Sequence, residues 1–385
     1  MAEYRGDIYS KSALRDSTDH FRSIRDLGPA VWLPKYKLWA VGRFDDVRGC
    51  LRADDKLISG KGIAANPILN GLEAKITLTS DGDVHKRRRS VLMKPLGPGE
   101  LKNLQQRIQG EADSLVARLK KESRFDAMPA FASYLPVSIV AELVGLKPAG
   151  RENMLRWAAG AFEAIGPLNW RTLRALPALL DMRRYATNLK RADVVPGGWA
   201  DKIFAAAEDG SLSLEEAQAM VIDYVAPSLD TTILATGNML RYLAQSPDAF
   251  AAVKNDEKLL TNAVYEAARL ASPIRGFTRC ANEDFDVSGV MIPKGARALI
   301  LYASANRDER HYVDPDRFDL SRNARDNVAW GHGQHVCVGM HLARLEMECL
   351  LRALAQQVSR IETGEPTPFL NNVLQGYKSL PTTFH

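Results

Sequence analysis

Residues 330–339, WGHGQHVCVG, place a single cysteine, Cys337, among three glycines. Glycine at this density indicates that the backbone turns sharply there or passes very close to another group. A helix is predicted from about Met340, with a buried stripe formed by Met347, Leu350, Leu351, Leu354 and Val358. Cys337 therefore lies just ahead of a helix N-terminus, where free N–H groups and the positive end of the helix dipole favour a thiolate. The pattern predicts an anionic sulfur ligand.

Two other interpretations of this stretch stay open on the residues alone. The first is a glycine-rich loop with an ordinary buried cysteine. The second is a zinc site, because four possible ligands fall within ten residues: His332, His335, Cys337 and His341. Donors packed this densely make a tetrahedron difficult, and known zinc spacings usually pair ligands across a longer gap.

The composition is that of a globular protein with a large core. The chain has 385 residues, of which 46% are hydrophobic and 25% charged. Length alone suggests two or three domains, but no repeat, low-complexity tract or linker marks a boundary. We therefore expect one domain over residues 1–385.

The charge pattern disfavours nucleic-acid binding. The net charge of +5 is modest and the basic residues are scattered, whereas nucleic-acid-binding proteins usually show a stronger excess and a recognisable module. A basic docking face for an acidic protein partner is the simpler interpretation.

The chain is expected to be cytoplasmic, with no membrane contact. The N-terminus shows no signal peptide or anchor, and the apolar stretch 219–243 contains Asp223 and Asp230, which argues against a membrane span. Four cysteines far apart in the sequence favour reduced thiols over disulfides.

The periodicity predicts a mainly α protein with a minor β portion. Short strands are expected at 31–33, 38–41, 285–290 and 297–302. Helical spacing dominates from residue 100 to residue 270.

The longest helical pattern runs from about Leu214 to Leu243, roughly 45 Å of helix. Pro227 lies inside it and lacks an N–H, so we expect a kink that frees the carbonyl of Asp223 and can hold water. Asp230, followed by Thr231 and a second threonine, provides a potential proton relay beside the kink. Polar residues simply tolerated at a packing kink are the alternative.

The cysteine stretch resembles the ligand loop of the cytochrome P-450 family, Phe-Gly-x-Gly-x-His-x-Cys-x-Gly, at every fixed position except the first, which is Trp330. Three further motifs occur in the family's order, so the resemblance covers nearly the whole chain. Glu266-Ala267-Ala268-Arg269 with Pro315-Asp316-Arg317-Phe318 is similar to the second, and 85–89 to the third. Residues 226–232 resemble the fourth, Ala-Gly-x-Asp/Glu-Thr-Thr, although Pro227 and Ser228 depart from it.

The resemblance implies a single-domain cytochrome P-450 fold in which a long central helix crosses over haem b. It implies a monooxygenase that inserts one oxygen atom from O₂ into a small organic substrate, by hydroxylation or O-dealkylation. Cys337 would bind the iron, Asp230 and Thr231 would be catalytic, and Glu266, Arg269 and Arg317 would form a buried charged triad. The other implied cofactor contacts are His85, Arg89, Ala226, Arg279, Trp330, Gly331, His335 and Gly339.

Family position implies a substrate pocket formed by residues 63–72, 162–170, 274–277 and 375–377. Its implied substrate contacts are Asp223, Ile274, Arg275, Phe277 and Tyr377. The stretch 162–177, with Trp199 beyond it, loosely resembles members that oxidise aromatic acids and ethers. Arg275 would pair with such an acid, whereas Asp223 would repel it unless protonated or turned away.

Electrons are expected from an external donor, because the sequence shows no flavin, NAD(P)H or iron–sulfur fingerprint. The resemblance implies a ferredoxin or flavodoxin, which would dock on the cysteine side through basic residues such as Arg87 or Arg344. A non-catalytic thiolate-haem binding or sensing protein, and a zinc hydrolase, remain as alternative functions.

Overall fold

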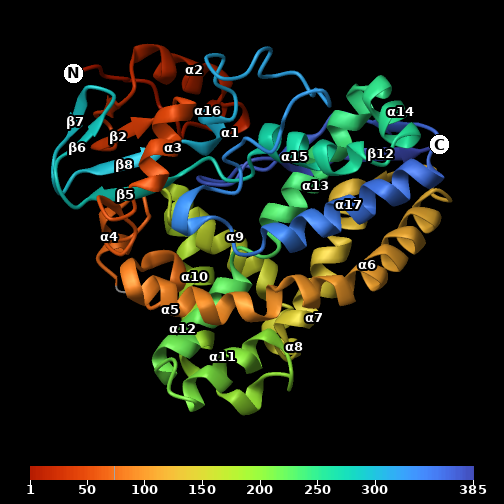
Figure 1. The fold of residues 1–385 in the computed structure, drawn as a ribbon, viewed down its shortest axis with the longest axis horizontal. Coiled ribbons are helices and arrows are strands. Elements are labelled where there is room, and N and C mark those ends of the chain that lie inside the picture. Colours follow the sequence, from red (N-terminus) through yellow and green to blue (C-terminus); the bar gives the residue numbers. More distant parts are fainter. Residues whose placement is uncertain (73) are drawn as a thin grey trace.

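The computed structural model describes residues 1–72 and 74–385 and is mostly helical (Figure 1). The helices of the N-terminal half are α1 (Lys11–Arg15), α2 (Thr18–Leu27), α3 (Phe44–Arg52), α4 (Pro67–Asn70), α5 (Gly82–Met93), α6 (Pro98–Leu119), α7 (Ala141–Val144), α8 (Pro148–Arg151), α9 (Met154–Ala164) and α10 (Trp170–Asn188). Those of the C-terminal half are α11 (Trp199–Glu208), α12 (Leu214–Val225), α13 (Asp230–Gln245), α14 (Pro247–Asn255), α15 (Leu259–Ala271), α16 (Tyr302–Ala305) and α17 (Met340–Gln357). The predicted mainly α class is confirmed.

The largest sheet joins two segments far apart in the sequence, residues 31–58 and residues 277–300. Its strand order is β1 (Val31–Leu33), β2 (Leu38–Val41), β8 (Arg297–Ile300), β5 (Phe277–Ala281) and β3 (Leu57–Ile58). The pairing of β2 with β8 is parallel and the other pairings are antiparallel. Three of the predicted strands therefore lie side by side in one sheet.

The strand predicted at 285–290 is instead a hairpin, which corrects the sequence interpretation. β6 (Phe285–Val287) pairs with β7 (Val290–Ile292) across a tight turn. Ser288 and Gly289 both have positive φ, 48° and 88°, as the two central residues of a type I′ hairpin turn must. The smaller sheets combine β4 (Phe125–Asp126), β12 (Pro381–Phe384) and β9 (Ile361–Thr363), and β10 (Thr367–Pro368) with β11 (Tyr377–Ser379).

One continuous core of buried apolar side chains extends from Ala30 to Phe384, and a smaller cluster, including Phe21 and Leu299, lies beside it. This continuity supports the proposal that residues 1–385 form one domain. Across residues 1–72 and 74–385, none of the helices is both long enough and apolar enough to cross a membrane.

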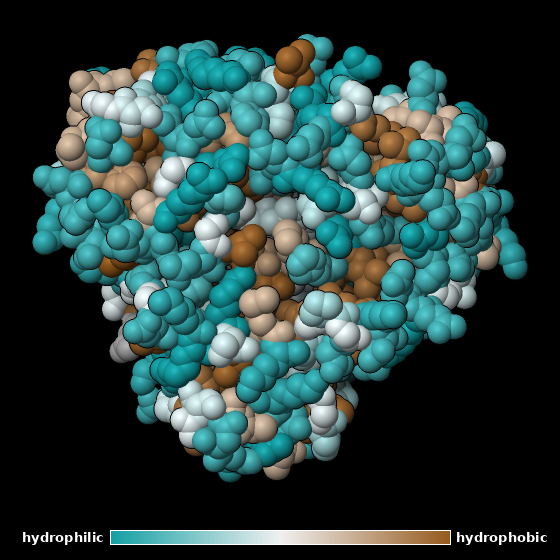
Figure 2. Space-filling view, viewed as in Figure 1, coloured by the Kyte–Doolittle hydropathy of each residue, from teal (hydrophilic) through white to brown (hydrophobic). Residues whose placement is uncertain are grey.

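The predicted long helix is interrupted, and this is a second correction. α12 ends at Val225 and α13 begins at Asp230, so four non-helical residues separate two helices where we expected one kinked helix. The expected helix at the cysteine stretch is confirmed, because α17 begins at Met340. In Figure 1, α17 crosses the front of the molecule above α6. The same face is mostly polar, with apolar residues reaching the surface in a hollow near its middle (Figure 2).

Candidate active site

The loop that carries Cys337 is held by two glycines with left-handed backbones. Gly331 has a φ of 74° and Gly333 a φ of 71°. A Cβ atom on Gly333 would lie 2.3 Å from the carbonyl oxygen of Leu51 in α3, so no side chain fits there. The Cys337 N–H donates to the carbonyl of Trp330 at 2.8 Å and closes the loop. The glycine density thus marks both a sharp turn and a close approach, as the sequence indicated.

Cys337 is surrounded by protein on most sides, and its side chain is still partly accessible to solvent. Burial raises the pKa of its thiol. The N–H groups of Gly339 and Met340 at the start of α17, and the positive charge of Arg89, act in the opposite direction. These groups stabilise the thiolate form that a metal ion would bind.

Four nitrogen-bearing side chains gather beside this loop: His85 and Arg89 from α5, Arg279 from β5, and His335. The rings of His85 and His335 lie 4.2 Å apart. Burial, followed by the charges of Arg279, His85 and Arg89, lowers the pKa of His335 to about 3. The guanidinium of Arg89 donates to the carbonyl of Val336 at 2.7 Å. All four predicted residues are thus brought together.

Buried polar atoms in and beside this cluster have no partner in the part of the chain that the structure describes. They are both ring nitrogens of His85 and the indole nitrogen of Trp330. The carboxylate of Asp81 lies 4.0 Å from the Nε2 atom of His335. Buried cations and unpaired donors need anionic partners, and haem b brings two propionates. The residues present therefore fit haem b, with Cys337 as the thiolate ligand and the cluster around the propionates.

Glu266 and Arg269 form a fully buried ion pair on α15. The guanidinium meets both carboxylate oxygens, at 2.7 and 2.8 Å, and both side chains are 0% exposed. The prediction that Arg317 is the third member of this triad is wrong. Arg317 is exposed and offers only its backbone carbonyl, whereas Arg322 approaches Glu266 at 3.3 Å.

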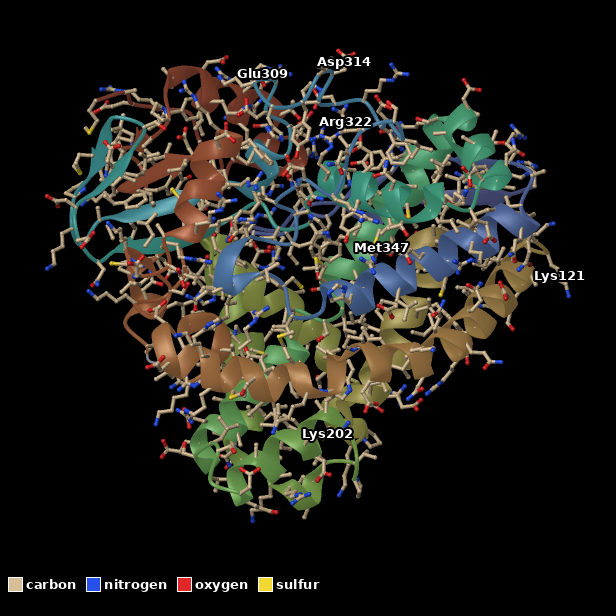
Figure 3. The ribbon with its side chains drawn as sticks, in the orientation of Figure 1. Lys121, Lys202, Glu309, Asp314, Arg322 and Met347 are labelled. Atoms are coloured by element: carbon tan, nitrogen blue, oxygen red, sulfur yellow. The ribbon has the colours of Figure 1, made fainter. Side chains whose placement is uncertain are left out.

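Arg322 lies in the loop above α17, and Met347 marks that helix (Figure 3). Two arginines five positions apart in one loop leave no sequence signal for choosing between them. Glu346 was also missed, although its signal was present: it falls at helical spacing among the buried residues Leu342, Ala343, Met347 and Leu350.

The gap between α12 and α13 carries the predicted acid and threonine. Burial raises the pKa of Asp230 to about 7, and its Oδ2 atom is buried without a partner among residues 1–72 and 74–385. The Thr231 hydroxyl donates to the carbonyl of Pro227 at 2.9 Å. The Ser228 hydroxyl donates to the Tyr224 carbonyl, the group that a helical N–H of Ser228 would otherwise contact. Ala226 follows the last residue of α12 as its C-cap and packs against the core.

Three of the predicted pocket segments meet. The N–H of Ala65 donates to the Ile165 carbonyl at 2.8 Å, and the N–H of Thr278 donates to the Ile63 carbonyl at 3.0 Å. The ring of Phe277 stacks on Phe162, with 6.5 Å between ring centres. Ile274, on the same segment as Phe277, forms an isolated bridge with Leu374.

Three predicted substrate contacts are engaged elsewhere, which corrects the expected pocket. The Asp223 carboxylate accepts the N–H of Thr77 at 2.8 Å, and burial raises its pKa to about 6. The guanidinium of Arg275 donates to the carbonyls at the end of α1, those of Ala13 at 3.2 Å and Leu14 at 2.7 Å. It is therefore occupied and does not present its charge to a substrate acid.

Tyr377 is the third. Its ring lies under the guanidinium of Arg241, at 5.6 Å. Arg241 is eleven residues beyond Asp230 on α13, roughly 16 Å along the helix. The ring of Tyr377 is therefore engaged by Arg241, farther along α13 than the acid and the threonine.

The zinc alternative gains no support. Within 1–72 and 74–385, no group of three or more histidine, cysteine, aspartate or glutamate side chains is arranged to hold a metal ion.

Comparisons with known proteins agree with this geometry. The family model described as cytochrome P450 matches residues 199–378. The chain is 33% identical over 381 residues to cytochrome p450 CYP199A2 of Rhodopseudomonas palustris, covering 97% of this chain and 92% of the relative. It is 28% identical to linalool 8-monooxygenase of Pseudomonas putida, covering 97% and 96%.

Solved structures show the same fold. The haem domain of CYP116B5 from Acinetobacter radioresistens has a TM-score of 0.88 at 20% identity, covering 99% of this chain and 97% of that one. CYP109Q5 from Chondromyces apiculatus has a TM-score of 0.82 at 25% identity, covering 100% and 98%.

Proposed function

Because this chain belongs to the cytochrome P450 family, whose members bind haem b and act as monooxygenases, we propose that it oxidises a small aromatic substrate by hydroxylation or O-dealkylation. The observation that best supports haem-thiolate chemistry is that the Cys337 loop lies against a cluster of four residues: His85, Arg89, Arg279 and His335. Cys337 would hold the iron of haem b and the cluster its propionates. Bound haem supplies oxygen activation, and a thiolate ligand favours cleavage of the O–O bond.

The chain's own part in this chemistry is to deliver protons. Release of one oxygen atom of O₂ as water consumes two protons and two electrons. Asp230 keeps a proton near neutral pH because burial raises its pKa to about 7. Thr231 follows directly and carries a hydroxyl that is able to pass a proton on. We assign Asp230 as the proton donor and Thr231 as the relay.

The proposal of an aromatic substrate rests on three aromatic side chains that contact one another at the start of β5. Phe162 stacks on Phe277, and Phe277 meets Tyr302 edge to face, with 6.0 Å between ring centres. Such rings favour flat apolar ligands. Of the two predicted classes, an aromatic ether suits this pocket better than an aromatic acid, because Arg275 is occupied by the carbonyls of α1.

Two measurements test this function. The reduced, CO-bound holoenzyme should show the red-shifted Soret band of thiolate ligation, and Cys337→Ala should lose it. A panel of matched methoxybenzenes and benzoic acids should shift the spin state of the haem, with the ethers binding more tightly. Tighter binding of the acids would refute the pocket assignment and leave the haem-thiolate assignment intact.

We also propose a cytoplasmic location and electron delivery by a ferredoxin or flavodoxin that docks beside the cysteine loop. Of the two arginines expected there, Arg87 is engaged by Glu216 at 2.7 and 2.9 Å. Arg344 contacts Tyr265 at 2.9 Å and Glu348 at 3.3 Å. The exposed Arg52, whose guanidinium donates to His332 of the loop at 2.9 Å, is a further basic contact for an acidic partner.

A further inference from the structure

Arg88 is a buried arginine whose side chain faces another helix. Its Nε and Nη2 atoms lie 3.1 and 3.0 Å from one carboxylate oxygen of Glu216, which belongs to α12. The side chains of the two residues are only 9% and 10% exposed. Figure 1 shows α5, which carries Arg88, beside α12. A buried ion pair therefore joins these two helices.

Glu216 keeps its charge because other groups also bind its carboxylate. The N–H of Ser213 donates to it at 2.8 Å and closes a capping box at the start of α12. The exposed side chain of Arg87 donates to both of its oxygens. The hydrogen bond from Arg87 is the largest of the effects that lower the pKa of Glu216 to about 2. The partner of Arg88 is therefore ionised throughout the neutral pH range.

Arg88 also binds the backbone of the segment that precedes α5. Its Nη1 atom donates to the carbonyl of Ile76 at 3.2 Å. The N–H of the same peptide unit, that of Thr77, donates to the carboxylate of Asp223 on α12 at 2.8 Å. Glu216 and Asp223 are about two helical turns apart, so they lie on one side of α12. This one peptide unit is therefore held at both ends, between α5 and α12.

Stability alone does not account for the ion pair between Arg88 and Glu216. Burial of two charges costs free energy, and apolar replacements for a buried ion pair are often neutral or stabilising. α5 already buries Val91 and Leu92 in the core. What the charged pair adds is a defined orientation, because the planar guanidinium meets a carboxylate in few geometries.

We propose that Arg88 is a positioning residue for the haem site. His85 lies three residues before it on the buried face of α5, and Arg89 follows it directly. Both belong to the cationic cluster beside the Cys337 loop. The contacts that fix the position and rotation of α5 therefore also fix two of the side chains that would hold the haem propionates.

The partner helix gives the position of α5 a second consequence. α12 leads to the break that is followed by Asp230 and Thr231. The pair of Arg88 and Glu216 therefore holds the cationic cluster in register with the proposed proton relay. This role rests on the proposed function, but loss of haem is measured without turnover and without knowing the substrate.

The first experiment removes both charges from the holoenzyme with Arg88→Leu/Glu216→Gln. Leucine suits the buried side of α5, and glutamine at its position in α12 is still able to close the capping box. We expect the midpoint of thermal unfolding to stay within about 4 °C of that of the unaltered protein. Transfer of haem to apomyoglobin should become at least about fivefold faster. The CO-bound spectrum should keep its position, because Cys337 is untouched.

The second experiment separates the two contacts of Arg88. Lysine keeps a positive charge opposite Glu216 but lacks the fork that also reaches Ile76. Arg88→Lys should therefore restore most of the haem retention, whereas amide exchange in residues 74–80, measured by mass spectrometry, should stay faster than in the unaltered protein. Arg87→Gln is the matched control, because it removes the neighbouring arginine from the same carboxylate. It should leave amide exchange in residues 74–80 unchanged.

Three outcomes would overturn the role of Arg88. They are haem loss from the double variant at the unaltered rate, faster amide exchange along the whole chain rather than in α5 and residues 74–80, or the same local loosening in Arg87→Gln as in Arg88→Lys. The first of these would leave the haem-thiolate function intact. Unaltered protein that carries no haem would instead refute the proposed function itself.

Discussion

Glu346 is a buried acid on α17, and one of its oxygens has no hydrogen-bond partner among the described residues. Burial raises its pKa to about 8. In the unfolded chain the same group titrates near 4.5. Between these values the folded state binds more protons, so this group's contribution to stability falls as pH rises from about 4.5 to about 8 and is constant above that.

The variant Glu346→Gln should therefore flatten the pH dependence of stability. Its free energy of unfolding, relative to that of the unaltered protein, should rise by on the order of 3 kcal/mol between pH 5 and pH 9, because an amide does not ionise. Denaturant unfolding at the two pH values measures this. Glu348→Gln, on the same helix and paired with Arg344, is the matched control, and equal slopes in both variants would contradict the assignment.

Thr231 and Asp230 differ in what their loss should do. Thr231→Ala should lower product formed per electron consumed at least severalfold, because the relay hydroxyl is gone, while Thr231→Ser should restore most of it. Full coupling in the alanine variant would remove the assignment.

Asp230→Asn tests the donor. If Asp230 supplies the proton, turnover should fall as pH rises through about 7, where its carboxyl loses that proton. The Asp230→Asn variant should turn over more slowly, and its rate should not fall as pH rises through this range. A pH profile identical in shape to that of the unaltered enzyme would exclude Asp230 as the donor.

At the scale of the elements, buried ion pairs join α15 to the loop above α17, and the stability they contribute depends on which arginine of that loop contacts Glu266. Arg322→Ala should lower the free energy of unfolding by about 1–3 kcal/mol, because the buried carboxylate of Glu266 loses a charged partner. Arg317→Ala should change it by less than about 0.5 kcal/mol, because that side chain is exposed. Thermal unfolding of the two variants side by side decides between them.

Proline alone does not explain the break between α12 and α13. Pro177 lies inside α10, and that helix continues through it. At the break, the Ser228 hydroxyl also occupies the Tyr224 carbonyl. Pro227→Ala/Ser228→Ala should restore helical hydrogen bonds and slow amide exchange in residues 224–232, measured by mass spectrometry. Pro177→Ala, the control, should leave exchange in that peptide unchanged.

These elements show what the sequence could predict. Apolar periodicity predicted helical structure between residues 100 and 270 and the helix that begins at Met340. The glycines around Cys337 indicated a close approach to another group, which is the backbone of Leu51. The cationic cluster was predictable because His85, Arg89 and His335 lie in motifs and the family resemblance implied Arg279. The engagement of Arg275 by α1, and the choice of Arg322 over Arg317, depend on contacts between residues far apart in the chain. No local pattern encodes such contacts.

For the whole molecule, electron delivery by an acidic partner should depend on ionic strength. The chain carries a net charge of +5, and steering between opposite charges weakens as salt screens them. Reduction by a ferredoxin should slow as salt is raised from about 0.05 to 0.5 M, in stopped-flow measurements, while reduction by dithionite should not. Rates that rise or stay level would exclude electrostatic docking.

The five-stranded sheet also constrains how the protein is made. Strands β2 and β3 are complete by Ile58, but β8, the partner of the open edge of β2, and β5, the partner of β3, are complete only at Ile300. At ribosomal speeds, roughly 12–50 s separate the synthesis of these residues. Through that interval the early strand edges have no partners, so the nascent chain depends on chaperones, or on its own first helices, to keep those edges from aggregating.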